Sequence, residues 1–435
     1  MKINHNSLSV FLAICSGLLV AILASLYLAY IYKMGGNAWF GVNTPTTYDG
    51  LSYYNEILAY QSMIESFNIA GLVTAYGALV VLIYSPIVIS PQIASWWPLC
   101  VNSVLLFSSA FLFALALAKA ASFRICSNFI GTYQTCVKRT KLASIGPLTM
   151  FCILFLVLLN PYYIGSLLVP SKDILALTVS VGYLFYLIST LSKANPASRP
   201  SPRLLIAFST LLLLAFAVRI TLFLGLFFCT VYFLLRSSWL PRFVSHPLSS
   251  YLLSAFISAT IFLYFQTVSF ESAGSALNSA ISSGYKYLFI PILPFIYSLW
   301  DFFKSPTSLM LGFNIVQFSF SVNGIFALSL IVPFFLLLYF RSFKSVDAST
   351  RKLWAMTSIA IAVPICSGYV HVRYLYEFFP WMLVSLSFRF GYRFILVWAT
   401  QLLPLAFVIK LLLGFFGLLI YSPNLPEYVL PPFLM

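Results

Sequence analysis

Charged residues are scarce in this sequence, and acidic residues are the scarcest. Asp, Glu, Lys and Arg together make up 8% of its 435 residues, whereas soluble domains carry about a quarter. Asp and Glu number only nine against 24 Lys and Arg, and 61% of the residues are hydrophobic. With a mean hydropathy of +0.97, this balance excludes a water-soluble globular protein.

Signatures of nucleotide-driven and hydrolytic chemistry are missing as well. The chain has no P-loop, no Gly-x-Ser-x-Gly, no His-Glu-x-x-His and no dinucleotide-binding fingerprint. Its seven cysteines form no Cys-x-x-Cys pair and lie mostly inside or beside apolar runs, where cysteine acts as a small apolar residue. We therefore expect no cofactor and no metal site, with a divalent ion left open as an alternative.

Long apolar runs are what the sequence has instead. Runs of about 18 residues or more are long enough to cross a bilayer as helices, and backbone in lipid must satisfy its own hydrogen bonds. We predict an all-α polytopic transmembrane bundle of about 11 spans, between about 9 and 13, forming one integral membrane domain over residues 1–435. The first run, about residues 8–32, is expected to be a retained span because it is too long for a signal peptide.

Basic residues fall in short clusters between these runs, so the net charge of +15 indicates membrane orientation and not nucleic-acid binding. All clusters share the cytoplasmic side if residues 68–90 stay outside as interfacial or re-entrant helix; an inverted first span is the alternative. We favour the placement of residues 68–90 outside, which predicts an outer loop with interfacial helices at 34–97 and a second long outer segment at 267–321. Residues 204–235 are too long for one span and predict two short helices joined near Arg219.

A polar stretch at residues 43–65 follows the first run and carries three of the nine acidic residues. Asp49 is a candidate general base, because a carboxylate beside a sugar hydroxyl can take its proton. The alternative is a turn residue, since Asp-Gly is a common turn pair. Glu56 would share a helix face with Asp49 if the stretch is helical, or would be an exposed loop residue. Tyr53 and Tyr54 lie between them as supporting residues.

Three charged residues stand beside later apolar runs. Asp173 suits a helix N-terminus, where a carboxylate meets unpaired amides, and Lys172 precedes it on the predicted outer face. Arg219 is flanked by apolar residues on both sides. Two interpretations of Arg219 are open. Either it binds an anionic phosphate, or it is an interfacial arginine whose side chain reaches the membrane surface.

A second concentrated polar site lies near residue 375. Arg373 and Glu377 are spaced for a structural ion pair on a helix. Alternatively, Arg373 binds phosphate while Glu377 or His371 orients it, with Tyr374 in support. Both interpretations stay open.

The order of these features resembles the GT-C superfamily of membrane glycosyltransferases and the polymerases of bacterial surface polysaccharides, including O-antigen polymerases. The similarity is one of layout over most of the chain, and Gly50 follows Asp49 where many members have a second acidic residue, which argues against a metal-dependent member. Four elements carry it: Asp49 to Tyr54, Asn160-Pro-Tyr-Tyr with Pro170-Ser-Lys-Asp173, Val218-Arg219, and Arg373-Tyr374 with Pro380.

The resemblance implies transfer of a sugar or oligosaccharide from a polyprenyl-linked donor, on the extracytoplasmic face of a bacterial inner membrane. Asp49 would be the general base, with Glu56 as a second catalytic candidate, and Lys172, Arg219 and Arg373 would bind the lipid phosphate. Membrane lipid and the lipid-linked sugar are the expected partners, with other polysaccharide-assembly membrane proteins as further candidates. The rival functions are a transporter or flippase of lipid-linked glycans, which broken helices would favour, and a non-catalytic scaffold.

Overall fold

The computed structural model describes residues 5–34, 57, 78–88, 91–127, 145–191, 202–235, 246–269, 324–340, 348–365 and 372–416. Within these ranges every regular element is a helix. In this described part of the chain, five helical stretches are long and apolar enough to cross a membrane: Leu8–Tyr27, Trp96–Ala120, Pro147–Ser166, Lys172–Leu191 and Tyr392–Leu413. The prediction of a helical chain with several possible spans is thus confirmed, and the count of about 11 stays a prediction.

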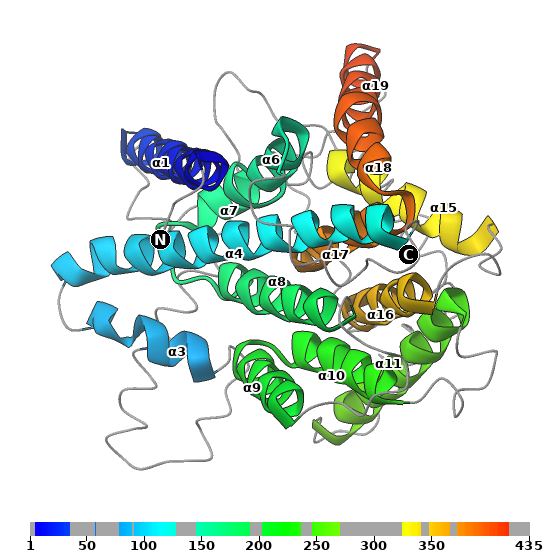
Figure 1. The fold of residues 1–435 in the computed structure, drawn as a ribbon. Coiled ribbons are helices and arrows are strands. Elements are labelled where there is room, and N and C mark those ends of the chain that lie inside the picture. The colour runs from blue at the N-terminus through cyan, green and yellow to red at the C-terminus, as the bar shows by residue number, and fades with distance from the viewer. Residues whose placement is uncertain are drawn as a thin grey trace.

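Helix α4 (Pro91–Ser127) runs through the middle of the bundle, with α1 (His5–Met34) on one side of it (Figure 1). It begins inside the 34–97 segment that the sequence suggested as outer loop, so the end of that segment is helix. Pro91 begins α4, in the first turn, where proline is well tolerated because no N–H partner is lost. The kink-prone position is Pro98 alone.

The described part of residues 68–90 is short. It consists of α3 (Ala78–Tyr84) and the 3-10 turn η2 (Ser85–Val88), which together rise roughly 18 Å, well short of the ~30 Å hydrocarbon layer. The indole of Trp97 in α4 donates to the Ile83 carbonyl at 2.9 Å, which ties this unit to the start of α4. Residues 68–77 lie outside the described residues, so the re-entrant placement stays a prediction.

The chain next forms α6 (Pro147–Ile153), the π-helical turn η4 (Leu154–Leu158), α7 (Pro161–Ser166) and α8 (Lys172–Leu191). Prolines begin α6 and α7, where their missing N–H has no consequence. The Asn160 side chain accepts the Tyr162 N–H at 3.0 Å and so caps α7. Helix α8 packs along α4, with the Ser109 and Thr178 hydroxyls 2.9 Å apart between them.

Arg219 separates α9 (Pro202–Val218) from α10 (Ile220–Leu234), as the sequence predicted. Its backbone is extended, with φ −160° and ψ 124°. Rings meet across the junction, since Phe216 lies 5.3 Å from Phe223 and Phe208 lies 5.5 Å from Phe233 between centroids. The two helices therefore form an antiparallel hairpin with Arg219 at its tip, and both short helices of the prediction are confirmed.

The second half of the chain completes the bundle around α16 (Ala348–Ile365), against which α10 and α11 (Pro247–Ser269) pack. Gly391 separates α17 (Phe379–Phe390) from α18 (Tyr392–Val397). Its φ of 68° is a backbone angle that glycine adopts without strain. Residues 392–415 form one continuous helical run. The predicted outer segment at 267–321 lies almost wholly outside the described residues. The elements are α11 (Pro247–Ser269), η5 (Ala327–Ile331), α15 (Val332–Phe340), α16 (Ala348–Ile365), η6 (Val372–Phe378), α17 (Phe379–Phe390), α18 (Tyr392–Val397), η7 (Trp398–Leu402) and α19 (Leu403–Phe415).

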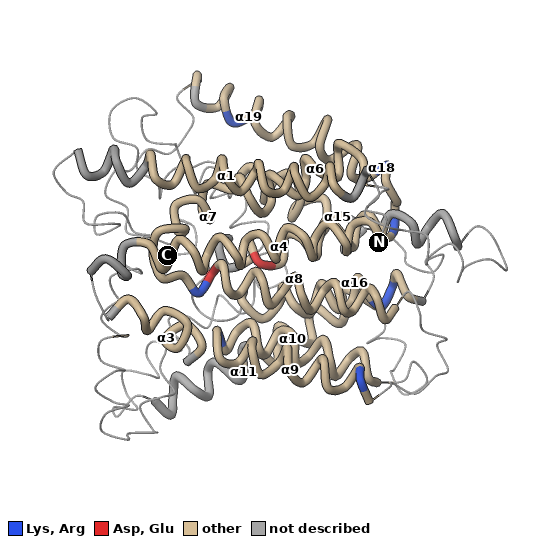
Figure 2. The backbone as a smooth tube through the Cα atoms, turned by 60° about the vertical axis from the view of Figure 1, so that its left-hand side comes forward, with Lys and Arg blue, Asp and Glu red and all other residues tan. Residues whose placement is uncertain are grey.

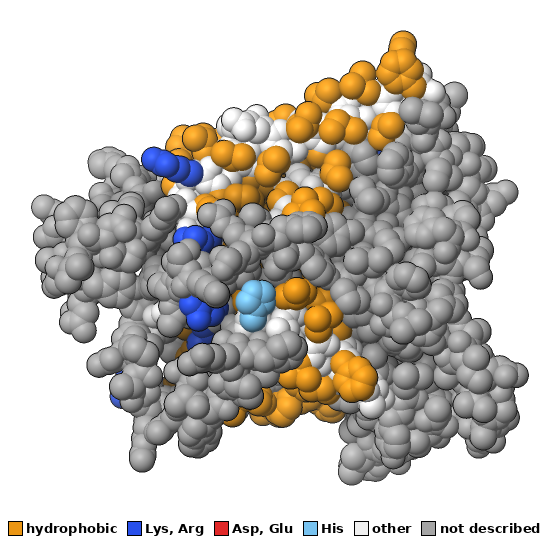
Figure 3. Space-filling view, turned by 90° about the vertical axis from the view of Figure 1, so that its right-hand side faces the viewer, with side chains coloured by type: hydrophobic (Ala, Val, Ile, Leu, Met, Phe, Trp, Pro, Cys, Tyr) orange, Lys and Arg blue, Asp and Glu red, His pale blue; other side chains and the backbone are white. Residues whose placement is uncertain are grey.

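Basic residues gather at one end of the bundle, near the ends of α9, α16 and α18 (Figure 2). Lys119 donates to the Ser189 hydroxyl close to the last turn of α8, and Lys352 donates to the Phe233 carbonyl at the last turn of α10, 2.6 Å away. Figure 3 shows Lys and Arg side chains on one side of a histidine and apolar side chains on its other side. The acidic positions lie away from this end, within the bundle (Figure 2).

Candidate functional site

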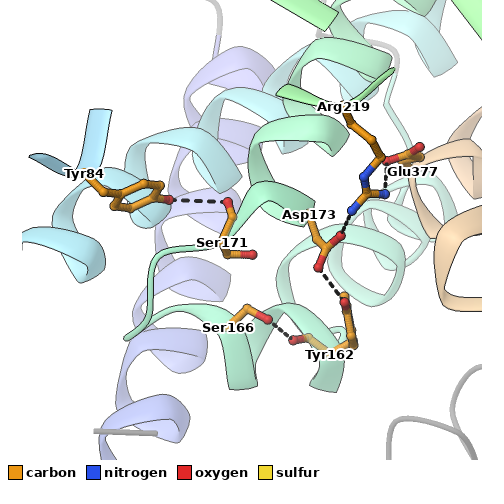
Figure 4. Close-up of polar contacts among 7 residues, drawn as sticks. All are labelled: Tyr84, Tyr162, Ser166, Ser171, Asp173, Arg219 and Glu377. Carbon is orange, nitrogen blue, oxygen red and sulfur yellow. Dashed lines mark hydrogen bonds and ion pairs between the residues drawn. The ribbon is translucent and has the colours of Figure 1, made fainter. Parts of the chain in front are cut away.

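Arg219 joins the two acidic side chains that the structure describes (Figure 4). Its guanidinium pairs with a carboxylate oxygen of Asp173, and Nη1 lies 3.3 Å from Glu377 Oε2. The three residues come from the first turn of α8, the tip of the α9–α10 hairpin and the end of η6. We call this set, with Tyr162, the Arg219 cluster.

The hairpin tip places Arg219 in the bundle without leaving its backbone unsatisfied. Its N–H donates to the Ala215 carbonyl at 2.8 Å, and its own carbonyl accepts from Phe223 N–H at 3.0 Å. One extended residue thus ends one helix and begins the next. The side chain is only 9% exposed, so its charge needs nearby carboxylates to offset the cost of removing it from water.

Asp173 occupies the position that the sequence predicted, in the first turn of α8, where the positive end of the helix dipole favours a carboxylate. Both of its carboxylate oxygens also contact other residues. One oxygen contacts Arg219, and the other accepts the Tyr162 hydroxyl proton at 2.6 Å. At 19% side-chain exposure, Asp173 is the most accessible member of the ion pair set.

Glu377 is the deepest acidic group, at 3% exposure. Oε2 faces Arg219, whereas Oε1 receives no hydrogen bond from any residue that the structure describes. The backbone carbonyl of Glu377 accepts the Ser180 hydroxyl at 2.8 Å, and Trp381 donates to that hydroxyl at 2.9 Å. The residue is therefore firmly held while one carboxylate oxygen keeps its full acceptor capacity.

The protonation of Glu377 is set by opposing influences. It lies in η6, outside the five helices able to cross the membrane. Burial raises the pKa of Glu377, Arg219 lowers it, and the neighbouring negative charge of Asp173 raises it. Burial disfavours the charged carboxylate more than the arginine favours it, so this group binds a proton more readily than an exposed glutamate does.

Aromatic rings connect α7 to η6 beside the cluster. Tyr162 stacks on Tyr376 with centroids 5.5 Å apart and planes 10° apart, and Tyr163 lies 5.9 Å from Tyr376. Tyr376 also contacts Phe379 at 4.8 Å. Because these rings are buried, they exclude water and strengthen the electrostatic interactions of the ion pairs.

Among the described side chains of the cluster and its neighbour Lys172, the formal charges sum to zero, since Lys172 and Arg219 balance Asp173 and Glu377. A phosphate at Arg219 would therefore face two carboxylates already bound to the guanidinium. Such an arrangement favours a neutral ligand that donates a hydrogen bond over an anion. Phosphate binding at Arg219 stays a prediction that this geometry does not favour.

The structure brings together four of the predicted site residues: Lys172, Asp173, Arg219 and Glu377. Arg373 and Tyr374 lie in η6, with only their backbone described. The remaining predicted residues lie outside the described ranges: Asp49, Tyr53, Tyr54, Glu56 and His371. Sequence reasoning missed Tyr162 as a site residue, although it belongs to the Asn160-Pro-Tyr-Tyr element, 11 residues before Asp173.

In the described part of the chain no three His, Cys, Asp or Glu residues are grouped as a metal site would require. The two described carboxylates are instead held by an arginine. Comparison of the chain with protein-family models, with curated proteins and with solved structures gives no match. The function must therefore be inferred from the residues and geometry of the Arg219 cluster.

Proposed function

We propose that this protein is a membrane glycosyltransferase that moves a sugar or oligosaccharide from a polyprenyl-linked donor to an acceptor hydroxyl. The reaction would take place on the extracytoplasmic face of a bacterial inner membrane, during synthesis or polymerisation of a surface polysaccharide. The buried Glu377 carboxylate carries this proposal, because Oε1 accepts no hydrogen bond from the described residues and lies beside a fixed cation. A sugar hydroxyl supplies the hydrogen that such an oxygen accepts.

The chemistry needs a proton acceptor at this point. The acceptor hydroxyl oxygen attacks the anomeric carbon of the donor, and the bond from that carbon to the phosphate oxygen breaks. The lipid phosphate leaves with the bonding electron pair, and the hydroxyl proton passes to a carboxylate. Glu377 suits that last role, since its raised affinity for a proton and its fixed backbone match a general base near neutral pH.

Arg219 and Tyr162 would orient the two carboxylates. Arg219 binds one carboxylate oxygen of Glu377, and the other oxygen would face the acceptor hydroxyl. Both carboxylate oxygens of Asp173 are bound, one by Arg219 and the other by Tyr162. The departing phosphate requires cations elsewhere. Lys172 and Arg373 are the proposed partners, because each lies within a few residues of the cluster along the chain.

The end of the bundle at which the cluster lies supports an extracytoplasmic site. Lys172 begins α8 and Arg219 forms the hairpin tip, whereas Lys119 contacts the opposite end of α8 and Lys352 the opposite end of the hairpin. Clustered Lys and Arg mark the cytoplasmic side of a membrane protein. By this rule the Arg219 cluster belongs to the outer half of the membrane.

A transfer assay with the purified full chain in lipid nanodiscs tests the proposal. The protein is incubated with polyprenyl-phosphate and polyprenyl-diphosphate sugars and with a panel of saccharide acceptors, and glycosidic products are identified by mass spectrometry. Formation of a new glycosidic bond is expected. Lys119→Gln, in α4 beside the far end of α8, is the matched control and should retain that activity.

The rival transporter function is tested with the same purified protein in proteoliposomes. Proteoliposomes loaded with the lipid-linked sugar on one leaflet report its movement to the other leaflet. Movement of the lipid without any new glycosidic bond would replace the transferase proposal by a transporter. Neither movement nor transfer, with all donors and acceptors, would leave the scaffold interpretation as the better one.

A further inference from the structure

Asn102 is a fully buried polar residue in the middle of apolar helix α4. Its side-chain nitrogen lies within hydrogen-bond distance of three carbonyls, those of Ser166 at 3.1 Å, Leu167 at 3.0 Å and Val169 at 2.9 Å, so its two N–H groups are shared among the three oxygens. Its side-chain oxygen accepts the hydroxyl proton of Tyr84. The three carbonyls belong to the end of α7 and to the turn that connects α7 with α8.

These contacts replace hydrogen bonds that the turn itself makes poorly. The last carbonyls of a helix have no partner within that helix. The turn's own backbone bonds are long, 3.3 Å from Leu167 N to Ile164 O and 3.4 Å from Val169 N to Ser166 O, near the outer limit for such bonds. The Asn102 amide therefore supplies the stronger restraint on its conformation.

The restrained turn leads directly into the Arg219 cluster. Residue 171 is the last before α8, and the Tyr84 hydroxyl lies 3.5 Å from the Ser171 carbonyl (Figure 4). At the start of the turn the Ser166 hydroxyl donates to the Tyr162 carbonyl at 3.0 Å. The position of Asp173, two residues beyond Ser171, thus depends on groups from α3, α4 and α7.

We infer that Asn102 is a positioning residue, which through its amide fixes residues 166–171 so that Asp173 meets both Arg219 and Tyr162. Arg219 in turn holds Glu377, so the amide in α4 acts on the proposed base through two intermediates. The role in turnover rests on the proposed function, while the role in fixing the turn does not. A displacement of about 1 Å at such a site lowers turnover by roughly 100-fold.

Asn102→Asp is the informative variant because it keeps the size of the side chain. An aspartate still accepts from Tyr84 but, when ionised, has no N–H for the three carbonyls. Tyr84→Phe is the complementary change, since it removes the hydroxyl and keeps the three amide contacts. Asn102→Gln keeps the amide and serves as the conservative variant for rescue.

Hydrogen–deuterium exchange of the full chain in nanodiscs measures the turn directly. For Asn102→Asp, amide exchange should rise at least about tenfold over residues 166–175 and stay unchanged in α11, which packs on α16. Asn102→Gln should return part of the protection, and Tyr84→Phe should show a smaller rise. Unchanged exchange over 166–175 in Asn102→Asp would overturn the inference, whatever the transfer activity.

Initial rates of sugar transfer decide whether the restraint matters for catalysis. Asn102→Asp should lower kcat about 10- to 100-fold and change the KM for the lipid donor by less than about threefold. A rise in exchange with unchanged kcat would show a purely structural asparagine and overturn the positioning role. If the wild-type chain transfers no sugar, the proposed function fails, and the exchange result alone then supports or overturns the restraint. If Asn102→Asp does not fold, Tyr84→Phe is carried through both measurements, and no change in either would overturn the inference.

Discussion

Replacement of Arg219 by glutamine leaves two carboxylates in the bundle without their shared cation. Asp173 and Glu377 keep side-chain exposures of 19% and 4%, so neither is well hydrated. Removing one partner of a buried ion pair destabilises a protein by about 3–5 kcal/mol. The accessible Asp173 reduces the cost, and protonation of Glu377 reduces it further, so we expect about 2–4 kcal/mol for Arg219→Gln at neutral pH.

The double variant Arg219→Gln/Glu377→Gln separates this charge effect from a loss of packing. If the unpaired glutamate causes most of the damage, removal of its charge recovers stability, and the two changes should be coupled by about 1.5–3 kcal/mol. The pH dependence has a definite sign. The loss in Arg219→Gln should be greatest where both carboxylates are ionised and should shrink as the pH falls and they bind protons.

Unfolding free energies of the purified protein in detergent micelles, measured with a chemical denaturant at several pH values, provide the assay. Lys119→Gln, a charge change in α4 beside the opposite end of α8, is the matched control. It should lower the free energy of unfolding by less than about 1 kcal/mol. Additive effects of Arg219→Gln and Glu377→Gln, or a loss in Arg219→Gln that does not vary with pH, would refute the reasoning.

Three further predictions concern single positions. Tyr162→Phe keeps the stack on Tyr376 but loses the bond to Asp173, so thermal unfolding should show a loss of about 0.5–1.5 kcal/mol, and a loss above 3 kcal/mol would show another role for the hydroxyl. Gly391→Ala forces a side chain into φ 68° and ψ −159°, which should cost about 1–3 kcal/mol, and wild-type stability would contradict that backbone conformation. Single cysteines at Lys172 and Arg203 should react with impermeant thiol reagents from opposite faces of the membrane, and labelling from one face would remove the proposed sidedness.

The local features of the fold followed from the sequence where one residue changed the pattern. Arg219 interrupts an apolar run too long for one span, and the hairpin at that residue is what the structure shows. Lys172 and Asp173 precede another run, and α8 begins there. Helix α4 begins at Pro91, inside the segment expected to be outer loop, because the first turn of a helix accepts proline.

The contacts of the site were beyond the reach of one sequence. Arg219 is separated from Asp173 by 46 residues and from Glu377 by 158, and no local pattern indicates which charges meet across a bundle. The sequence therefore left a phosphate or the membrane surface as the surroundings of Arg219, where the structure places two carboxylates. Asn102 drew no attention because a single amide in an apolar run has no periodic partner, although a buried polar group needs hydrogen bonds.

The initial rate of sugar transfer by Glu377→Gln, compared with that of Asp49→Asn, is the most direct measurement. Glutamine keeps the shape of the side chain and cannot take the acceptor proton, so a general base at Glu377 predicts a fall in kcat of about 100-fold or more. Asp49→Asn tests the base that the sequence pattern suggested. Transfer by Glu377→Gln at the wild-type rate, in a preparation where Lys119→Gln is also active, would contradict the role assigned to the Arg219 cluster.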